Sequence, residues 1–157
     1  MAETIAIASD HAAFELKAIL AEWLREQGHV VRDLGPATAD SVDYPDYGYK
    51  LAASIAAGQA TKGVALCGSG IGISIAVNRN PACRCARVDD GLSARLARQH
   101  NDANVVAFGA RLVGADTAKD ILTEFLGTAF DGGRHARRVE KLGHPDLTAL
   151  SSERQPA

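Results

Sequence analysis

A run of apolar residues that ends in a glycine-rich turn most constrains the fold of this chain. Residues 63–67 (GVALC) have the character of a buried strand, the turn GSGIG follows at 68–72, and apolar residues resume as far as Asn78. A short apolar run is typical of a buried parallel strand, and closely spaced glycines let the backbone turn sharply towards a ligand. The stretch therefore predicts strand, loop and helix, with free backbone N–H groups that favour an anion.

Two reactive side chains, Cys67 and Ser69, lie in this turn. Unpaired N–H groups stabilise a thiolate, so the turn offers a base or nucleophile beside oxyanion donors. A buried cysteine that acts only as a small apolar side chain is the alternative. The glycines stand at alternate positions 68, 70 and 72, which departs from the dinucleotide-binding pattern Gly-x-Gly-x-x-Gly and disfavours a nicotinamide cofactor.

Four further strand-like runs alternate with helical patterns. We expect strands near residues 4–8, 29–34, 85–88 and 105–109, and helices near 12–27, 46–57, 71–77, 92–99, 117–126 and 134–142. This alternation predicts an α/β fold, a three-layer α/β/α sandwich with a five-stranded parallel sheet. In the helix at 92–99, Leu92, Leu96 and Ala97 are expected to face the core and Arg95 and Arg98 to face solvent. Asp116 is expected to cap the helix that follows it.

Length and composition predict a single domain over residues 1–142 and a weakly ordered tail over 143–157, since the 157 residues are 46% apolar and 23% charged. A formal net charge of -2 gives no reason to expect nucleic acid or an anionic membrane as a partner. There is no apolar run of about 18 residues and no basic leader, so we expect a cytoplasmic protein. The cysteines at 67, 83 and 85 form neither an even disulfide set nor a Cys-x-x-Cys zinc pair, which predicts free thiols.

Polar residues follow the first and fifth strands, where ligands bind to an open α/β sheet. Asp10 and His11 follow the first strand, and Arg111 follows the fifth. The alternatives are that Asp10 only caps a helix and that His11 is incidental. Residues 35–47 form a loop long enough to border a binding site, which makes Tyr44 a candidate for a pocket wall.

Two more groups of residues complete the set of candidate site residues. His100 and Asn101 lie in a polar turn before the fifth strand, and histidine is not a usual turn residue. Arg134 and Arg138 are four residues apart at a helix N-terminus, where both guanidinium groups share one face and an anion is favoured. A basic surface helix is the alternative. Arginines that bind a phosphate, a thiolate that removes a proton beside a carbonyl and N–H groups that hold the oxyanion together predict a phosphosugar site.

Five stretches resemble the type B ribose-5-phosphate isomerases and their relatives, the galactose-6-phosphate isomerase subunits. They are ASDHAA at 8–13, VDYPD at 42–46, CGSGIG at 67–72, HNDANV at 100–105 and GGRHARRV at 132–139. The resemblance implies a Rossmann-like domain and a homodimer or dimer of dimers whose sites combine two subunits. It also implies interconversion of ribose 5-phosphate and ribulose 5-phosphate through a cis-enediolate, with no metal and no cofactor.

The resemblance also implies a role for each site residue. Cys67 corresponds to the catalytic base, Ser69 to the hydroxyl residue that holds the enediolate, and His100 to the residue that opens the furanose ring with help from Asp10. Two alternatives stay open: the same chemistry on another sugar phosphate (tetrulose, allose or galactose phosphate), or a non-catalytic phosphosugar-binding subunit. The predicted substrate-binding residues are His11, Tyr44, Gly68, Gly70, Gly72, Asn101, Arg111, Arg134 and Arg138, with the phosphate held by His11, Arg134 and Arg138 and a further contact from Arg111.

Overall fold

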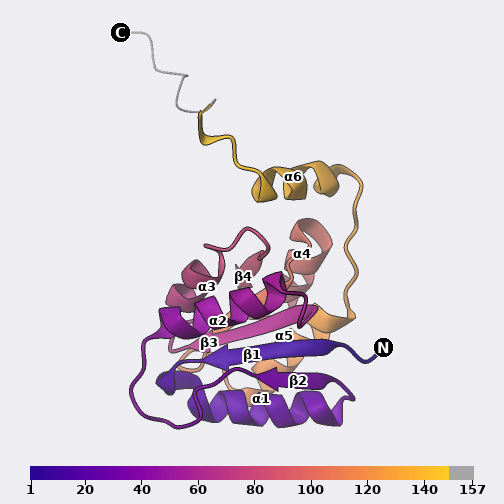
Figure 1. The fold of residues 1–157 in the computed structure, drawn as a ribbon. Coiled ribbons are helices and arrows are strands. Elements are labelled where there is room, and N and C mark those ends of the chain that lie inside the picture. Colours follow the sequence, from indigo (N-terminus) through magenta and orange to yellow (C-terminus); the bar gives the residue numbers. More distant parts are fainter. Residues whose placement is uncertain (149–157) are drawn as a thin grey trace.

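The computed structural model describes residues 1–148 and places a five-stranded sheet between two layers of helices (Figure 1). All neighbouring strands pair in parallel in the order β2-β1-β3-β5-β4, which confirms the predicted sandwich. The strands are β1 (Thr4–Ser9), β2 (Val30–Asp33), β3 (Lys62–Cys67), β4 (Cys85–Arg87) and β5 (Val105–Gly109). The helices are α1 (Phe14–Glu26), α2 (Tyr44–Ala56), α3 (Ile71–Val77), α4 (Gly91–Asn101), α5 (Ala115–Gly127) and α6 (Arg134–Gly143), and a 3-10 turn, η1 (His11–Ala13), precedes α1.

The strand register brings the polar ends of three strands to one edge of the sheet. Ser9 at the end of β1 pairs with Leu66 of β3, and Cys67 at the end of β3 pairs with Gly109 at the end of β5. Because all the strands are parallel, the loops that follow them leave from this same edge. The residues predicted after β1, β3 and β5 therefore meet there.

Two apolar cores lie on the two sides of the sheet. Successive side chains of a strand point to opposite faces, and β1 illustrates this with Ile5 and Ile7 in one core and Ala6 and Ala8 in the other. Helices α1, α4 and α5 complete the first core, whereas α2 and α3 complete the second. The sheet is thus buried on both faces, as the continuous apolar run of β3 predicts.

Helix α4 faces the core with a different side from the one we expect from its sequence. Ala97 is buried as expected, but Leu92 and Leu96 are exposed, and Ala94 and Arg98 are buried. Positions 94, 97 and 98 share one side of a helix, roughly opposite to positions 92 and 96. The small alanines let α4 pack closely on α5, and this places the larger leucines on the surface.

Helix α6 lies apart from the sandwich, beside α4 and joined to α5 by an extended segment (Figure 1). Its bounds agree with the predicted helix, while most of the tail expected over 143–157 lies outside the described residues. The N-cap of α5 is Gly114, with no side-chain capping bond, so the predicted cap by Asp116 is wrong. Within residues 1–148, no helix has both the length and the apolar character needed to cross a membrane.

Candidate active site

The turn after β3 holds the Cys67 thiol against a backbone donor. The Gly70 N–H donates to Cys67 Sγ at 3.0 Å, and the Ile71 N–H donates to Ser69 Oγ at 3.2 Å. Gly70 has φ +77° and lies so close to β5 that a Cβ there would stand 2.6 Å from the backbone of Phe108. Only glycine satisfies both conditions, so the close turn around the sulfur depends on this residue.

An open cleft of about 580 Å³ lies above the turn and is lined by Asp10, Tyr44, Cys67 and Arg111, among others. The tyrosine ring packs on Gly72, where a Cβ would meet it at 2.5 Å. The Arg111 side chain lies over Gly68, 3.2 Å from the position of a Cβ on that glycine. The glycines therefore make room for the side chains that form the cleft. Seven of the predicted residues line it: Asp10, Tyr44, Cys67, Gly68, Ser69, Gly72 and Arg111.

Asp10 is both a helix cap and a cleft residue. Its carboxylate accepts the Ala12 N–H at 2.9 Å, which confirms the capping alternative, yet the residue also lines the cleft while 7% exposed. A chain of bonds links an ion pair to the backbone next to Asp10. The buried Lys17 donates to both carboxylate oxygens of Asp33 at 2.7 Å. The same carboxylate accepts the Gly35 N–H, and the Gly35 carbonyl accepts the backbone N–H of the residue before Asp10.

His11 lies at the carboxyl edge of β1 and contacts the long loop before α2. Its Nδ1 lies 3.2 Å from both the backbone nitrogen and the carbonyl oxygen of Val42. The contact holds the end of this loop, two residues before Tyr44, which forms a wall of the cleft. His11 is itself exposed, so its ring is accessible to a ligand.

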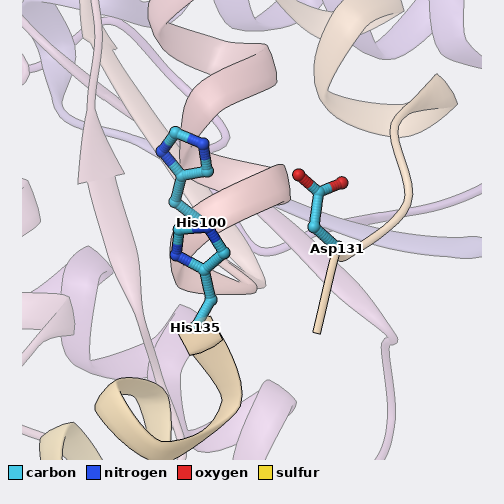
Figure 2. Close-up of side chains that lie close together, drawn as sticks. All are labelled: His100, Asp131 and His135. Carbon is cyan, nitrogen blue, oxygen red and sulfur yellow. The ribbon is translucent and has the colours of Figure 1, made fainter. Parts of the chain in front are cut away.

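A second cluster lies where α4 meets α6. The rings of His100 and His135 are stacked with centroids 4.4 Å apart and planes 10° from parallel, and Asp131 lies beside them (Figure 2). Ring nitrogens and a carboxylate oxygen of the three residues lie within 4.8 Å of one another. The lone pairs of the two rings lie in two nearly parallel planes, so they do not converge on one ion as the lone pairs of metal ligands do. Proton handling therefore fits the cluster better than metal binding does.

The charge around this cluster favours an anion. Partial removal from water lowers the pKa of His135, positive charge on His100, Arg134 and Arg138 lowers it further, and Asp131 opposes the shift. His135 therefore remains neutral to a lower pH than an ordinary histidine. Among the described residues, neither arginine forms an ion pair, so the helix offers free guanidinium groups to a phosphate.

A turn held by two ion pairs places His100 in this cluster. Asp102, with φ 45°, ends α4, and its carboxylate pairs with Arg98 at 2.8 Å and with Arg84 at 3.2 Å. Arg98 also donates to the carbonyl of Ala103 at 2.6 Å. These bonds explain why Arg98 is buried against its predicted exposure, and they make the polar turn a rigid support for the histidine.

The two clusters lie at opposite ends of the sheet within one chain. Cys67 pairs with the last residue of β5, Gly109, whereas the turn after His100 leads into its first residue, Val105. At about 3.3 Å per residue, the strand separates these ends by about 13 Å. The structure thus brings the predicted residues of the first cluster together but does not join them to His100, Asn101, Arg134 and Arg138.

Two residues near the clusters have no predicted role. His135 stacks on His100, and Arg87 at the end of β4 donates from Nε to the Ser69 carbonyl at 3.1 Å. Arg87 could have been found from its place at the carboxyl end of a strand, the edge to which the other predicted residues belong. The stacking of His135 depends on how α6 docks, which no local pattern reveals.

Comparisons with known proteins agree with this architecture. Residues 5–142 match the model of a family described as ribose/galactose isomerase. The ribose-5-phosphate isomerase B of Escherichia coli K12 is 43% identical over 150 residues, which cover 96% of this chain and 97% of that protein. The D-erythrulose-4-phosphate isomerase of Pectobacterium atrosepticum is 40% identical over 142 residues, which cover 90% of this chain and 93% of that protein.

Solved structures give the same result. The ribose-5-phosphate isomerase B of Clostridium thermocellum superposes with a TM-score of 0.90 and 44% identity, covering 93% of this chain and 99% of that one. The corresponding Thermotoga maritima structure has a TM-score of 0.88 and 49% identity, with 90% and 97% of the two chains covered.

Proposed function

This chain belongs to the ribose/galactose isomerase family, and from that premise we propose that it interconverts ribose 5-phosphate and ribulose 5-phosphate as an aldose–ketose isomerase. The observation that carries the proposal is the Cys67 thiol, which lines an open cleft and accepts a backbone N–H from a glycine turn. Such a thiol is placed to act as a base beside oxyanion donors. The three cysteine thiols of the chain are free, which supports a location in the reducing cytoplasm.

In the proposed reaction, the Cys67 thiolate removes the proton from C2 of the open-chain aldose. The electrons move to the C1 carbonyl oxygen and give a cis-enediolate. The hydroxyl proton of O2 passes to O1, and the proton held by Cys67 returns at C1, so that C1 becomes an alcohol and C2 a ketone. The Ser69 hydroxyl and turn N–H groups other than those of Gly70 and Ile71, which donate to Cys67 and Ser69, hold the negative oxygens of the enediolate. The step needs no electron acceptor, because oxidation at C2 and reduction at C1 balance within the substrate.

His100 is proposed to open the furanose ring before this step. Ring opening moves a proton from the anomeric hydroxyl to the ring oxygen, for which a neutral imidazole is suited. His135 stacks on His100 and stays neutral to a lower pH than usual, so it adds no positive charge there at neutral pH. Arg134 and Arg138, with His11 and Arg111 from the other cluster, bind the phosphate.

A complete site requires a second copy of the chain, and we propose a homodimer. About 13 Å of sheet separates Cys67 from the His100 end of one chain, so the two clusters serve one substrate only when they come from different subunits. Exposed apolar side chains lie on the two helices that lead into and out of the edge strand β4, namely Ile71 and Ile75 on α3 and Leu92 and Leu96 on α4. Exposed apolar patches mark surfaces that another protein covers, so we assign these four side chains to the contact between the two copies.

Two versions of this function differ in the sugar phosphate that the enzyme prefers. The D-erythrulose-4-phosphate isomerase relative favours a tetrulose phosphate as the second candidate. Turnover of purified protein on matched four-, five- and six-carbon sugar phosphates tests both versions. We expect the highest kcat/KM for ribose 5-phosphate, while a clear preference for the tetrulose phosphate moves the assignment to the second candidate. Binding of all of them without turnover identifies a phosphosugar-binding subunit instead.

Replacement of Arg134 with alanine is expected to raise KM about tenfold or more, because a hydrogen bond to a charged group contributes roughly 1.5 to 3 kcal/mol. Steady-state kinetics measure this, and Arg25→Ala is the matched control, since Arg25 is an exposed arginine paired only with Glu22 on α1. An unchanged KM in both Arg134→Ala and Arg138→Ala assigns α6 to the alternative of a basic surface helix.

A further inference from the structure

One peptide group in the glycine turn connects a guanidinium group to the Cys67 sulfur. Its carbonyl belongs to Ser69 and accepts from Arg87 Nε at 3.1 Å. Its N–H belongs to Gly70 and donates to Cys67 Sγ at 3.0 Å. The cation and the thiol therefore contact opposite ends of the same amide.

An amide that accepts a hydrogen bond at its oxygen becomes a stronger donor at its nitrogen, and a charged donor increases the effect. Linked bonds of this kind strengthen one another by perhaps 10–30% each. The bond from Arg87 also fixes the orientation of the peptide plane at a residue whose glycine identity permits other conformations. The polarised amide makes the bond from the Gly70 N–H to the sulfur stronger, and the fixed peptide plane keeps this N–H pointed at the sulfur.

The surroundings of Arg87 leave this bond intact. A second guanidinium nitrogen pairs with Asp89, whose side chain is half exposed, so the carboxylate takes Nη1 and leaves Nε for Ser69. The Arg87 side chain is 26% exposed, and it reaches the turn from β4, a strand that contributes no residue to the lining of the cleft. The side chain is therefore mostly removed from water, where its charge is screened less than at a fully exposed site.

We propose that Arg87 is a positioning residue for the reaction, which orients and polarises the Ser69–Gly70 peptide so that the Gly70 N–H stabilises the thiolate of Cys67. The proposal rests on the proposed role of Cys67 as the base. It adds a group that never touches the substrate and acts through one shared peptide.

The test is the rate at which iodoacetamide alkylates Cys67, followed by mass spectrometry of the Cys67 peptide between about pH 6 and pH 9, around the ordinary thiol range. Burial raises the pKa of Cys83 to about 11 and raises that of Cys85 as well, so both stay protonated over most of this range. Arg87→Gln removes the cation, and Arg87→Met keeps the length of the side chain but has no donor. Arg95→Gln is the matched control, because Arg95 pairs with Glu124 on the surface, on helices away from the turn.

Arg87→Gln and Arg87→Met are expected to slow alkylation at neutral pH roughly two- to tenfold, the equivalent of one hydrogen bond. The rise of the alkylation rate with pH is expected to occur at a higher pH than in the wild type. Arg87→Lys restores part of the rate because it keeps the charge, and Arg95→Gln leaves the profile unchanged. kcat falls in parallel while KM changes little, which a merely structural role does not predict.

Wild-type alkylation profiles in Arg87→Gln and Arg87→Met overturn the proposal. Loss of the fold in both variants, judged by circular dichroism, also overturns it and makes Arg87 a structural residue. Slower alkylation with unchanged turnover supports the effect of Arg87 on the thiol but contradicts the proposed role of Cys67, so the two failures are distinguishable.

Discussion

Cys67→Ala is expected to lower turnover about 10²- to 10⁴-fold, the usual contribution of a general base, while the fold and the affinity for product are retained. The substitution removes the sulfur that accepts the Gly70 N–H, and alanine has no group that can take the C2 proton. Cys67→Ser is expected to be almost as poor, because a hydroxyl is far less acidic than a thiol. Steady-state turnover and exchange of the C2 proton with solvent measure the effect.

Cys83→Ala is the matched control for Cys67→Ala. Cys83 is a buried thiol in the second core, with a pKa raised to about 11 by burial, and it lies outside the cleft at Cys67. We expect its replacement to leave turnover close to wild type. Exchange of the C2 proton at the wild-type rate in Cys67→Ala contradicts the assignment of Cys67 as the base and leaves it a small buried apolar residue.

A mixture of Cys67→Ala and His100→Asn subunits is expected to recover activity that neither variant has alone. In a symmetric dimer with shared sites, each hybrid carries one site with both changes and one site with neither. Equal mixing makes half of the dimers hybrids, so roughly a quarter of the wild-type activity returns. Turnover after joint unfolding and refolding, or after co-expression, measures it.

The control is a mixture of Cys67→Ala with Cys67→Ser, which contains no intact thiol at any site and is expected to stay inactive. A mixture of Cys67→Ala and His100→Asn that assembles into dimers yet remains inactive contradicts the shared site. Measurable turnover by a monomer, isolated by sedimentation at low concentration, contradicts it as well, because the two clusters of one chain lie at opposite ends of β5.

Hydropathy and turn residues determined most of the fold and one half of the candidate site. The apolar run at 63–67 is short, unbroken and bounded by a glycine turn, which is typical of a strand covered on both faces. Parallel strands send the loops after them to one edge, so Asp10, Cys67 and Arg111 were predictable as neighbours from their positions alone. These features depend on local sequence and on a topological rule, and neither requires knowledge of the packing.

The outward face of α4 and the arginine behind the turn were decided only by the tertiary structure. Hydrophobicity predicts Leu92 and Leu96 inside, but the close approach of α4 to α5 selects the small side chains of Ala94 and Ala97 for the interface. The contact of Arg87 with the Ser69 carbonyl depends on how β4 lies beside the turn. Both are contacts between segments distant in sequence, which residue periodicity does not specify.

The family resemblance implies sites that combine two subunits, but the residue pattern alone does not show which predicted residues fall in which of the two clusters. Arg134 and Arg138 share a helix face, as their spacing predicts, yet that helix docks beside His100 and away from Cys67. Spacing along a helix is set by the covalent geometry of the backbone and is therefore readable from the sequence. Which end of the sheet a helix reaches is set by the sum of many weak side-chain contacts, so only the packed structure reveals it.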